Sequence, residues 1–298
     1  MGHHHHNHDH QQLTTQASEH RVFWAMVITG GFMTLEVVGG LISGSLALLA
    51  DAGHMFGDFA SLALAWWAFR LRHKPPDSKR SFGYDRFQVL AAFVNGLTLV
   101  FIAVWICIEA ISRLNDVPEI QALPMLGVAI AGLFANIGAF YVLGSGQSEN
   151  LNLRGAAAHV LGDLLGSMAA IVAAILIMTL GWTWADAVLS TIVAVLITKA
   201  GVGIIKSSGH ILLEGTPSEL SSSDVVEAVG TVEGVRDVHH VHVWALTGEK
   251  LLATLHAVVD QGGDLDGIRR KIESLLEEQF RIHHCTVQFE FDACEGHH

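Results

Sequence analysis

Six long apolar segments limit the possible folds of this chain more than any other feature. Each is at least as long as the ~20 residues that an α-helix needs to cross the hydrocarbon core of a bilayer. Backbone polar groups must be paired within the segment where no water is present, so apolar runs of this length predict membrane-spanning helices. The six segments are residues 22–43, 46–69, 87–113, 122–144, 155–180 and 184–206.

Charge divides the chain into an apolar part and an acidic part. Only 15% of the residues are charged, well below the ~25% of an average soluble domain. The formal net charge is −12, and the residues from Ser207 onwards carry nearly all of it, with 16 acidic and 6 basic side chains. This predicts a membrane domain in the lipid bilayer followed by a soluble domain. The acidic balance suits cations and argues against nucleic acid and anionic headgroups as partners.

Lys and Arg residues in the connections predict the orientation of the six spans. The connection between the second and third spans, residues 70–86, carries six of them, whereas the connection between the third and fourth has none. Because cytoplasmic loops are rich in Lys and Arg, residues 70–86 and both termini are expected in the cytoplasm. No cleavable signal peptide is visible before the first span.

Beyond residue 207 the pattern becomes that of a small α+β domain. Helical spacing and strand-like alternation follow one another in the order αββαβ, which predicts helices on one face of a sheet, as in ferredoxin-like or metallochaperone-like domains. The expected elements are residues 218–232, 235–247, 250–260, 264–280 and 284–292, after a hinge at 214–217. The expected domain bounds are 1–20 for a flexible His-rich tail, 21–207, 208–292, and 293–298 for a C-terminal tail.

The first 12 residues hold six of the 19 histidines. This tract is either a purification tag or a flexible tail that collects metal ions, since His-rich tracts bind metals. The three cysteines, Cys107, Cys285 and Cys294, do not make a disulfide framework.

Two of the apolar segments each carry a histidine and an aspartate at the same spacing. His54 and Asp58 lie on the second span, and His159 and Asp163 lie on the fifth. Residues four apart share one helix face, so each helix presents one imidazole and one carboxylate. Two nitrogen and two oxygen donors in a tetrahedron suit Zn²⁺, and the two carboxylates would neutralise its charge inside the bilayer.

Other polar residues in the spans have a simpler interpretation. Asp51 has no counterpart on the fifth span, and it is expected to support the ligands or to accept protons in a cavity rather than to bind metal directly. Hydrogen bonds between packed helices are the favoured interpretation of the remaining ones, with a polar cavity as the alternative. These are Glu36, Asn95, Asn136 and Ser167.

The same donor set predicts exchange of metal for protons. Metal binding favours neutral imidazole, whereas an emptied site with two carboxylates in a low-dielectric environment favours proton uptake. This is a physical basis for metal/proton antiport. An intramembrane zinc protease is a weaker alternative, because no HExxH motif occurs and catalytic zinc needs an open position for water. A membrane metal sensor would have no evident use for a buried four-ligand set.

Four stretches together resemble the cation diffusion facilitator family: GSLALLADAGHMFGD, FGYDRFQVLAAFVNG, LNLRGAAAHVLGDLLGS and HHVHVW. The resemblance extends over residues ~20–292. It implies a homodimer of the bacterial inner membrane that exports cytoplasmic metal by proton antiport, with alternating access around the intramembrane site. A histidine at position 54 implies a preference for zinc; the donor set leaves open whether cadmium, cobalt or nickel is also carried.

The resemblance also implies residue roles. His54, Asp58, His159 and Asp163 match the transport site of the family. Zinc is also implied as a regulatory ligand of the cytoplasmic domain, on His239, His256 and Glu290, with His240, Asp292 and Cys294 as further candidates. Alternation along the strand leaves open that His240 or His242 belongs to the core. Asp77 matches a second metal site in the 70–86 connection, but Tyr84 stands where a histidine is expected, so no strong site is expected there. A charge pair between Arg86 and Glu214 is implied at the membrane boundary, with solvated surface charges as the alternative.

Overall fold

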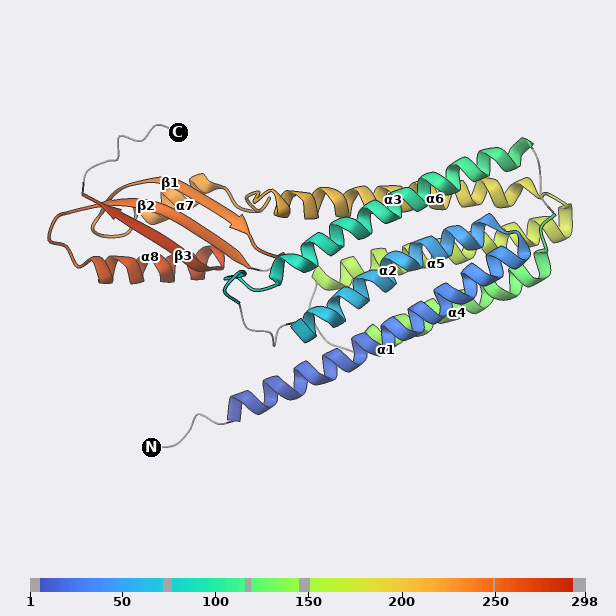
Figure 1. The fold of residues 1–298 in the computed structure, drawn as a ribbon, viewed down its shortest axis with the longest axis horizontal. Coiled ribbons are helices and arrows are strands. Elements are labelled where there is room, and N and C mark those ends of the chain that lie inside the picture. The colour runs from blue at the N-terminus through green and yellow to red at the C-terminus, as the bar shows by residue number, and fades with distance from the viewer. Residues whose placement is uncertain (1–5, 72–76, 116–118, 145–150, 249, 292–298) are drawn as a thin grey trace. The chain divides into compact units, whose positions relative to one another are not determined.

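The computed structural model describes residues 6–71, 77–115, 119–144, 151–248 and 250–291 (Figure 1). Side chains at 6–19, 21, 65, 68–71, 114–115, 138–144 and 151–165 lie outside the described part, although the backbone there is helical. The chain divides into two compact units. The first contains the residues up to Ser81 and Ala91–Ile205, and the second contains Phe82–Leu90 and the residues from Lys206 onwards.

All six predicted apolar segments are helical. The helices are α1 (His6–Ser43), α2 (Leu46–Leu71), α3 (Asp85–Asn115), α4 (Ala122–Gly144), α5 (Leu151–Leu180) and α6 (Trp184–Leu212). The flexibility expected of residues 1–20 stays a prediction, and α1 extends back from the first predicted span to His6. The physical reason is that neither glycine nor proline interrupts the sequence between His6 and Thr29.

Glycine ends α5 at the tight turn into α6. Gly181 has a φ of +69°, a left-handed conformation that is unfavourable for residues with a Cβ atom. Its N–H donates to the Ile177 carbonyl at 3.0 Å, and the N–H of Trp182 donates to the Leu176 carbonyl at 3.4 Å. These two bonds satisfy the carbonyls that the end of a helix leaves without partners, so α5 and α6 can follow one another across a short connection.

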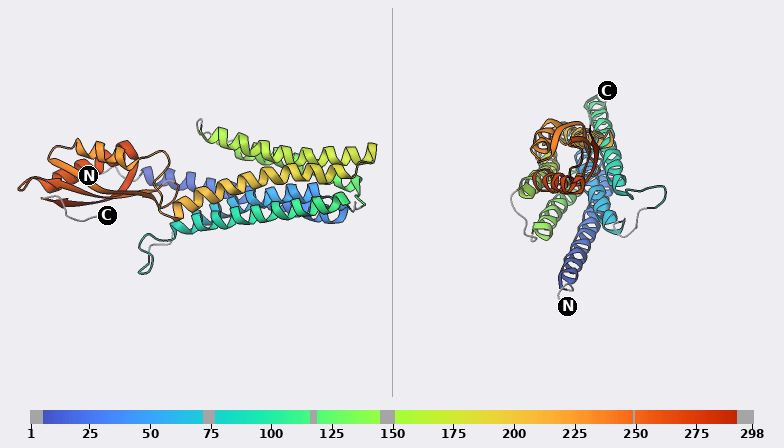
Figure 2. Two further views of the ribbon diagram at one scale, coloured as in Figure 1. Left: turned by 90° about the horizontal axis from the view of Figure 1, so that it is seen from above. Right: turned by 90° about the vertical axis from the view of Figure 1, so that its left-hand side faces the viewer.

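Four helices of the first unit form a closed set. α1 packs against α2, α2 against α5, α5 against α4, and α4 against α1. α3 and α6 lie side by side (Figure 2). A methyl group at Gly96 of α3 would lie 3.1 Å from the Gly201 carbonyl oxygen of α6, and one at Gly201 would lie 3.1 Å from the Gly96 carbonyl oxygen. Small residues therefore bring these two backbones together, as they do in membrane proteins.

Part of the helical unit has the length and composition of membrane spans. Among the residues that the structure describes, three stretches qualify, namely Val22–Ser43, Asp85–Arg113 and Trp184–Leu212, and two shorter apolar helices are Ala122–Ile137 and Gly166–Leu180. Large apolar side chains such as Phe101, Ile108 and Phe134 are exposed on the outside of these helices, as contact with lipid requires. Six complete spans stay a prediction.

The second unit contains the predicted αββαβ order. Its elements are α7 (Ser222–Gly230), β1 (Val235–Ala245), β2 (Leu251–Val259), α8 (Leu265–Phe280) and β3 (Ile282–Glu290). β2 lies at the centre of the sheet, antiparallel to β1 and parallel to β3. The parallel pair requires a crossover connection, which α8 provides.

Alternation along the strands gives the small sheet two different faces. Leu255 and Ala257 of β2 pack with Val229 of α7 and Ile272 and Leu276 of α8 in one buried apolar cluster. Residues of the opposite parity, which include His256, point to the other face. The helices therefore hold the sheet together from one side and leave polar side chains of all three strands on the other.

Candidate metal sites

The α2 half of the predicted transport site lies within the helical unit. His54 and Asp58 are both half-buried and one helical turn apart. The neighbouring positions Gly53 and Gly57 contact α3, since methyl groups there would lie 2.8 Å from Ile102 and 3.0 Å from Leu99. The two glycines therefore let α3 pack closely against one face of α2. His54 and Asp58 each follow one of these glycines, so they lie on the neighbouring face of the same helix.

The α5 half of the predicted site lies outside the described side chains. His159 and Asp163 fall on the helical backbone of α5, and α2 packs against α5. The helices that carry the two HxxxD pairs are therefore neighbours. The four-ligand set itself stays a prediction.

Buried polar side chains from five helices accompany the predicted ligands. Asp51, Glu36 and Ser167 are all 0% exposed, and Asn136 is 9% exposed. Ser167 donates its hydroxyl to Asp51 Oδ2 at 2.8 Å, and Asn136 Nδ2 donates to Ser167 Oγ at 3.4 Å. Asn95 of α3 donates to the Gly57 carbonyl, also at 3.4 Å. Hydrogen bonds between helices, which the sequence predicted for the asparagines and the serine, are present.

Asp186 was not identified from the sequence, and its carboxylate accepts three hydrogen bonds at the start of α2. Its side chain is 0% exposed. It accepts hydrogen bonds from Ser45 Oγ at 2.6 Å, from the Leu46 N–H at 2.7 Å and from the Ala47 N–H at 3.1 Å. Arg113 Nη1 lies 3.8 Å from Asp186 Oδ2. An acid at the start of α6 therefore caps the first turn of α2. A charged residue at the end of an apolar run was the only signal for it in the sequence.

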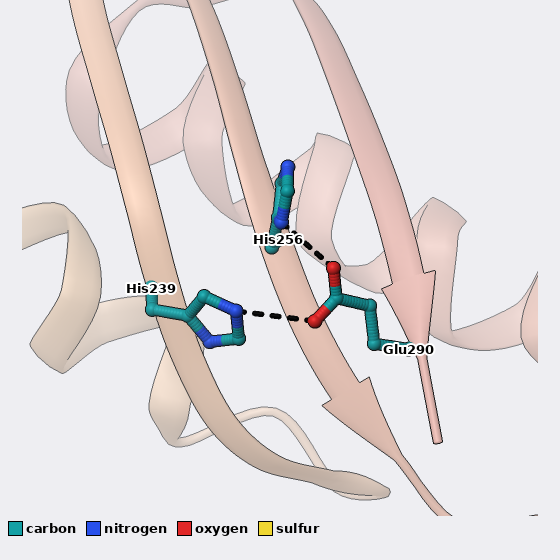
Figure 3. A group of neighbouring side chains, drawn as sticks. All are labelled: His239, His256 and Glu290. Atoms are coloured by element: carbon teal, nitrogen blue, oxygen red, sulfur yellow. Dashed lines mark hydrogen bonds and ion pairs between the residues drawn. The ribbon is translucent and has the colours of Figure 1, made fainter. Parts of the chain in front are cut away.

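Three predicted ligands meet on the open face of the small sheet. His239, His256 and Glu290 come from β1, β2 and β3, and one donor atom of each lies within 4.8 Å of the others. The Glu290 carboxylate lies between the two imidazoles, 3.1 Å from His239 Nε2 and 2.8 Å from His256 Nδ1 (Figure 3). Two imidazole nitrogens and a carboxylate are a donor set that divalent zinc accepts.

A β-bulge shapes this site. The register of β1 against β2 shifts between His239 and His242, and His240 has a φ of +50°. The ring of His240 stacks on that of His256 at 5.0 Å and lies 5.2 Å from that of His239. Simple alternation, which pairs His240 with His242, therefore does not hold, because the bulge brings two consecutive histidines beside His256. Backbone strain of this kind is concentrated at functional sites.

Neighbouring polar groups orient His239 and favour the ionised form of Glu290, and both effects favour the binding of a cation. Asp237 Oδ2 lies 3.0 Å from His239 Nδ1 and orients that ring, as carboxylates do behind metal-bound histidines. Burial opposes ionisation of Glu290, but the hydrogen bond from Gln288 and the positive charges available on His256 and His239 outweigh burial and lower the pKa of Glu290. The carboxylate therefore stays ionised at neutral pH. Asp237 and Gln288 were not identified from the sequence.

The remaining candidates fall in different places. Asp292 and Cys294 lie outside the described residues. Asp77 is exposed, and its Oδ1 accepts the backbone N–H groups of Lys79 and Arg80 at 2.8 Å, so it stabilises a turn. Arg86 Nη2 lies 2.9 Å from Glu214 Oε1, both within the second unit. Their side chains are 38% and 62% exposed, so this ion pair contributes at most about 1 kcal/mol to the free energy of unfolding. A role of the pair at the membrane boundary stays a prediction.

Comparison with known proteins finds one family domain in the helical part of the chain and another in the C-terminal part. The cation efflux transmembrane domain matches residues 22–213, and the cation efflux protein cytoplasmic domain matches residues 217–292. The chain is 48% identical over 287 residues to the zinc transporter ZitB of Pectobacterium atrosepticum, covering 96% of this chain and 89% of the relative. It is 45% identical to ZitB of Escherichia coli K12, covering 93% and 88%. It is 42% identical to a cadmium, cobalt and zinc/H(+)-K(+) antiporter of Bacillus subtilis, covering 90% and 88%.

Proposed function

Because this chain belongs to the cation efflux, or cation diffusion facilitator, family of transporters, we propose that it exports cytoplasmic Zn²⁺ in exchange for protons. Relatives named as zinc transporters, which match nearly the whole chain, support zinc as the substrate. The antiporter name of the Bacillus relative supports proton exchange, and its cadmium and cobalt support a wider metal range.

The packing of α2 on α5 is the observation that carries the proposal. α2 presents His54 and Asp58, and the matching pair His159 and Asp163 lies on α5. Ionisable groups in such apolar helices are costly and mark ion or proton pathways. Four donors from two adjacent helices would replace the hydration shell of one Zn²⁺ ion, and the two carboxylates would offset its charge.

Transport follows from exchange at these four groups. In the state open to the cytoplasm the imidazoles and carboxylates bind Zn²⁺ and release protons, since metal ligands must be deprotonated. After reorientation, protons from outside compete for the same groups and displace the ion. The inward proton gradient then drives metal outward, and alternating access requires that each state differ in its affinity for metal and protons.

The wider arrangement belongs to the same proposal. The chain crosses a bacterial inner membrane six times, with both termini in the cytoplasm, and it acts as a homodimer through its second domain. The domain bounds are 21–207 for transport and 208–292 for metal binding and dimerisation. The pair of Arg86 and Glu214 links the start of α3 to the end of α6 within the second unit.

Flux into proteoliposomes tests the proposed function. Purified protein is reconstituted with a zinc dye and a pH dye inside the vesicles, and Zn²⁺ is added outside across a pH gradient. Zinc entry is expected together with proton movement in the opposite direction, and reversal of the pH gradient is expected to change the rate. Zinc flux without counter-movement of protons would refute antiport, and no metal flux would refute transport.

Zinc at the sheet is proposed as a regulatory ligand. Occupancy of His239, His256 and Glu290 would bias the dimer only if the two transport states bind this zinc with different affinity. Unchanged transport after all three residues are replaced by Ala would remove the regulatory role. The full chain with Asp58→Ala, in which the predicted transport site is weakened, is the background for comparing zinc binding at the sheet between variants.

His256→Ala in that background is expected to lower zinc affinity at the sheet by about 100-fold, because the loss of a ligand exceeds the 10–100-fold effect of losing a supporting partner. Equilibrium dialysis with zinc quantification measures it. His242→Ala is the matched control, since His242 lies exposed on β1, the strand paired with β2, and outside the three-ligand group. Equal losses in both variants would contradict the assignment.

A further inference from the structure

We propose that Ser167 and Asp51 are positioning residues that determine the metal selectivity of the transport site. The inference rests on the proposed function and names a contact that affects which metal ion is transported. Ser167 Oγ donates to Asp51 Oδ2 at 2.8 Å, and both side chains are 0% exposed. A hydrogen bond between fully buried groups, one of them able to carry charge, is short and strong when no water competes.

This bond joins the two helices that carry the predicted ligands, close to those ligands. Asp51 lies three residues before His54 on α2, and Ser167 lies four residues after Asp163 on α5. At 1.5 Å of rise per residue these offsets are about 4.5 Å and 6 Å, so the bond lies roughly one turn from the ligand set on each helix. Residues three or four apart share a helix face, which places the bond on the ligand-bearing faces.

Glycines let the two helices approach at this level. A methyl group at Gly166 would overlap the carboxylate of Asp51. Likewise, a methyl group at Gly132 of α4 would overlap the carboxylate of Glu36 and lie 3.7 Å from Ser167 Oγ. The Asp51 carboxylate thus lies against the backbone of α5. At this level α2 and α5 meet through one hydrogen bond, and no side chain at position 166 keeps them apart.

Spacing between ligand-bearing helices sets the size of ion that the ligands can surround. Selectivity among divalent transition metals comes from geometry rather than from intrinsic affinity order. Zn²⁺ needs donors at about 2.0–2.2 Å, whereas the larger Cd²⁺ needs longer bonds. A tight contact between α2 and α5 therefore favours zinc. Loss of the hydroxyl lets the helices separate slightly, and the site then accepts cadmium at the expense of zinc.

Paired zinc and cadmium flux in proteoliposomes tests this inference. Ser167→Ala is expected to lower the ratio of kcat/KM for zinc to that for cadmium by about tenfold, the lower end of effects from partners behind metal ligands. Gly166→Ala is expected to shift the ratio in the same direction, because its methyl group would push the Asp51 carboxylate away from α5. Ser167→Thr keeps the hydroxyl and is expected to retain most of the wild-type ratio.

Ser190→Ala is the matched control. Ser190 is also 0% exposed, but its hydroxyl donates to the Ala187 carbonyl of its own helix at 3.0 Å and does not join α2 to α5. A ratio unchanged in Ser167→Ala, an equal loss for both metals, or the same shift in Ser190→Ala would overturn the inference. Wild-type protein without zinc flux would instead refute the proposed function, so the two failures are distinguishable.

Discussion

Asp58→Ala is expected to lower zinc flux by at least about 100-fold. The substitution removes one of two predicted carboxylate donors on an apolar helix, so a bound ion loses both a ligand and half of its charge compensation. Loss of a supporting partner alone costs 10–100-fold, and loss of a ligand should cost more. Initial rates of zinc entry into proteoliposomes, normalised to reconstituted protein, measure the effect.

Asp58→Asn separates charge from packing. It keeps the shape of the side chain but removes its charge, so a comparable loss of flux is expected. Ser61→Ala serves as the control, because Ser61 is on the same helix and its hydroxyl donates only to the Gly57 carbonyl at 2.8 Å. Near-normal flux in Asp58→Ala, with unaltered protein in size-exclusion chromatography, would show that Asp58 is not a transport ligand.

Asp186→Ala is expected to destabilise the helical unit by about 3–5 kcal/mol, as for breaking a buried pair from one side. The variant leaves the N–H groups of Leu46 and Ala47 without their acceptor, and it removes one of the two acidic neighbours of Arg113, the other being Glu109. For a chain of this size, such a loss corresponds to a fall in Tm of roughly 6–20 °C. Thermal unfolding in detergent, followed by tryptophan fluorescence, measures it.

Thr191→Val is the control for Asp186→Ala. Thr191 lies on the same helix, and its hydroxyl donates to the Ala187 carbonyl at 2.7 Å within α6. A small change in Tm is expected for this variant. A Tm of Asp186→Ala that equals the wild-type value would mean that water or another group replaces the acid at the start of α2.

Local patterns were enough to predict the elements of this fold. Apolar length predicted the six helices, and the turns at 44–45 and 181–183 fall between them as expected. Period-two alternation and amphipathic spacing predicted the αββαβ order of the second unit. α1 extends beyond the predicted span to His6, because a polar composition indicates exposure to water but does not by itself end a helix, and no glycine or proline interrupts this stretch.

The contacts within the sites were less accessible to sequence reasoning. Equal spacing on two spans predicted the transport ligands, which stay a prediction, and resemblance to a family predicted the group formed by His239, His256 and Glu290. The bulge at His240 could not be foreseen, because it depends on register between two strands. Asp186 and the Ser167–Asp51 bond join residues 141 and 116 positions apart, and local periodicity carries no information about such pairs.

The cap that Asp186 provides has a consequence for the timing of biosynthesis. The N–H of Leu46 and its acceptor are 140 residues apart. At 5–20 residues per second, synthesis of that length takes about 7–28 s, so α2 exists for that long before its first turn can receive the carboxylate. The start of the helix that carries His54 and Asp58 is therefore completed only after the first residues of α6 have been made. The predicted transport site would then be completed late in translation, and a chain that stops before residue 186 would lack this cap.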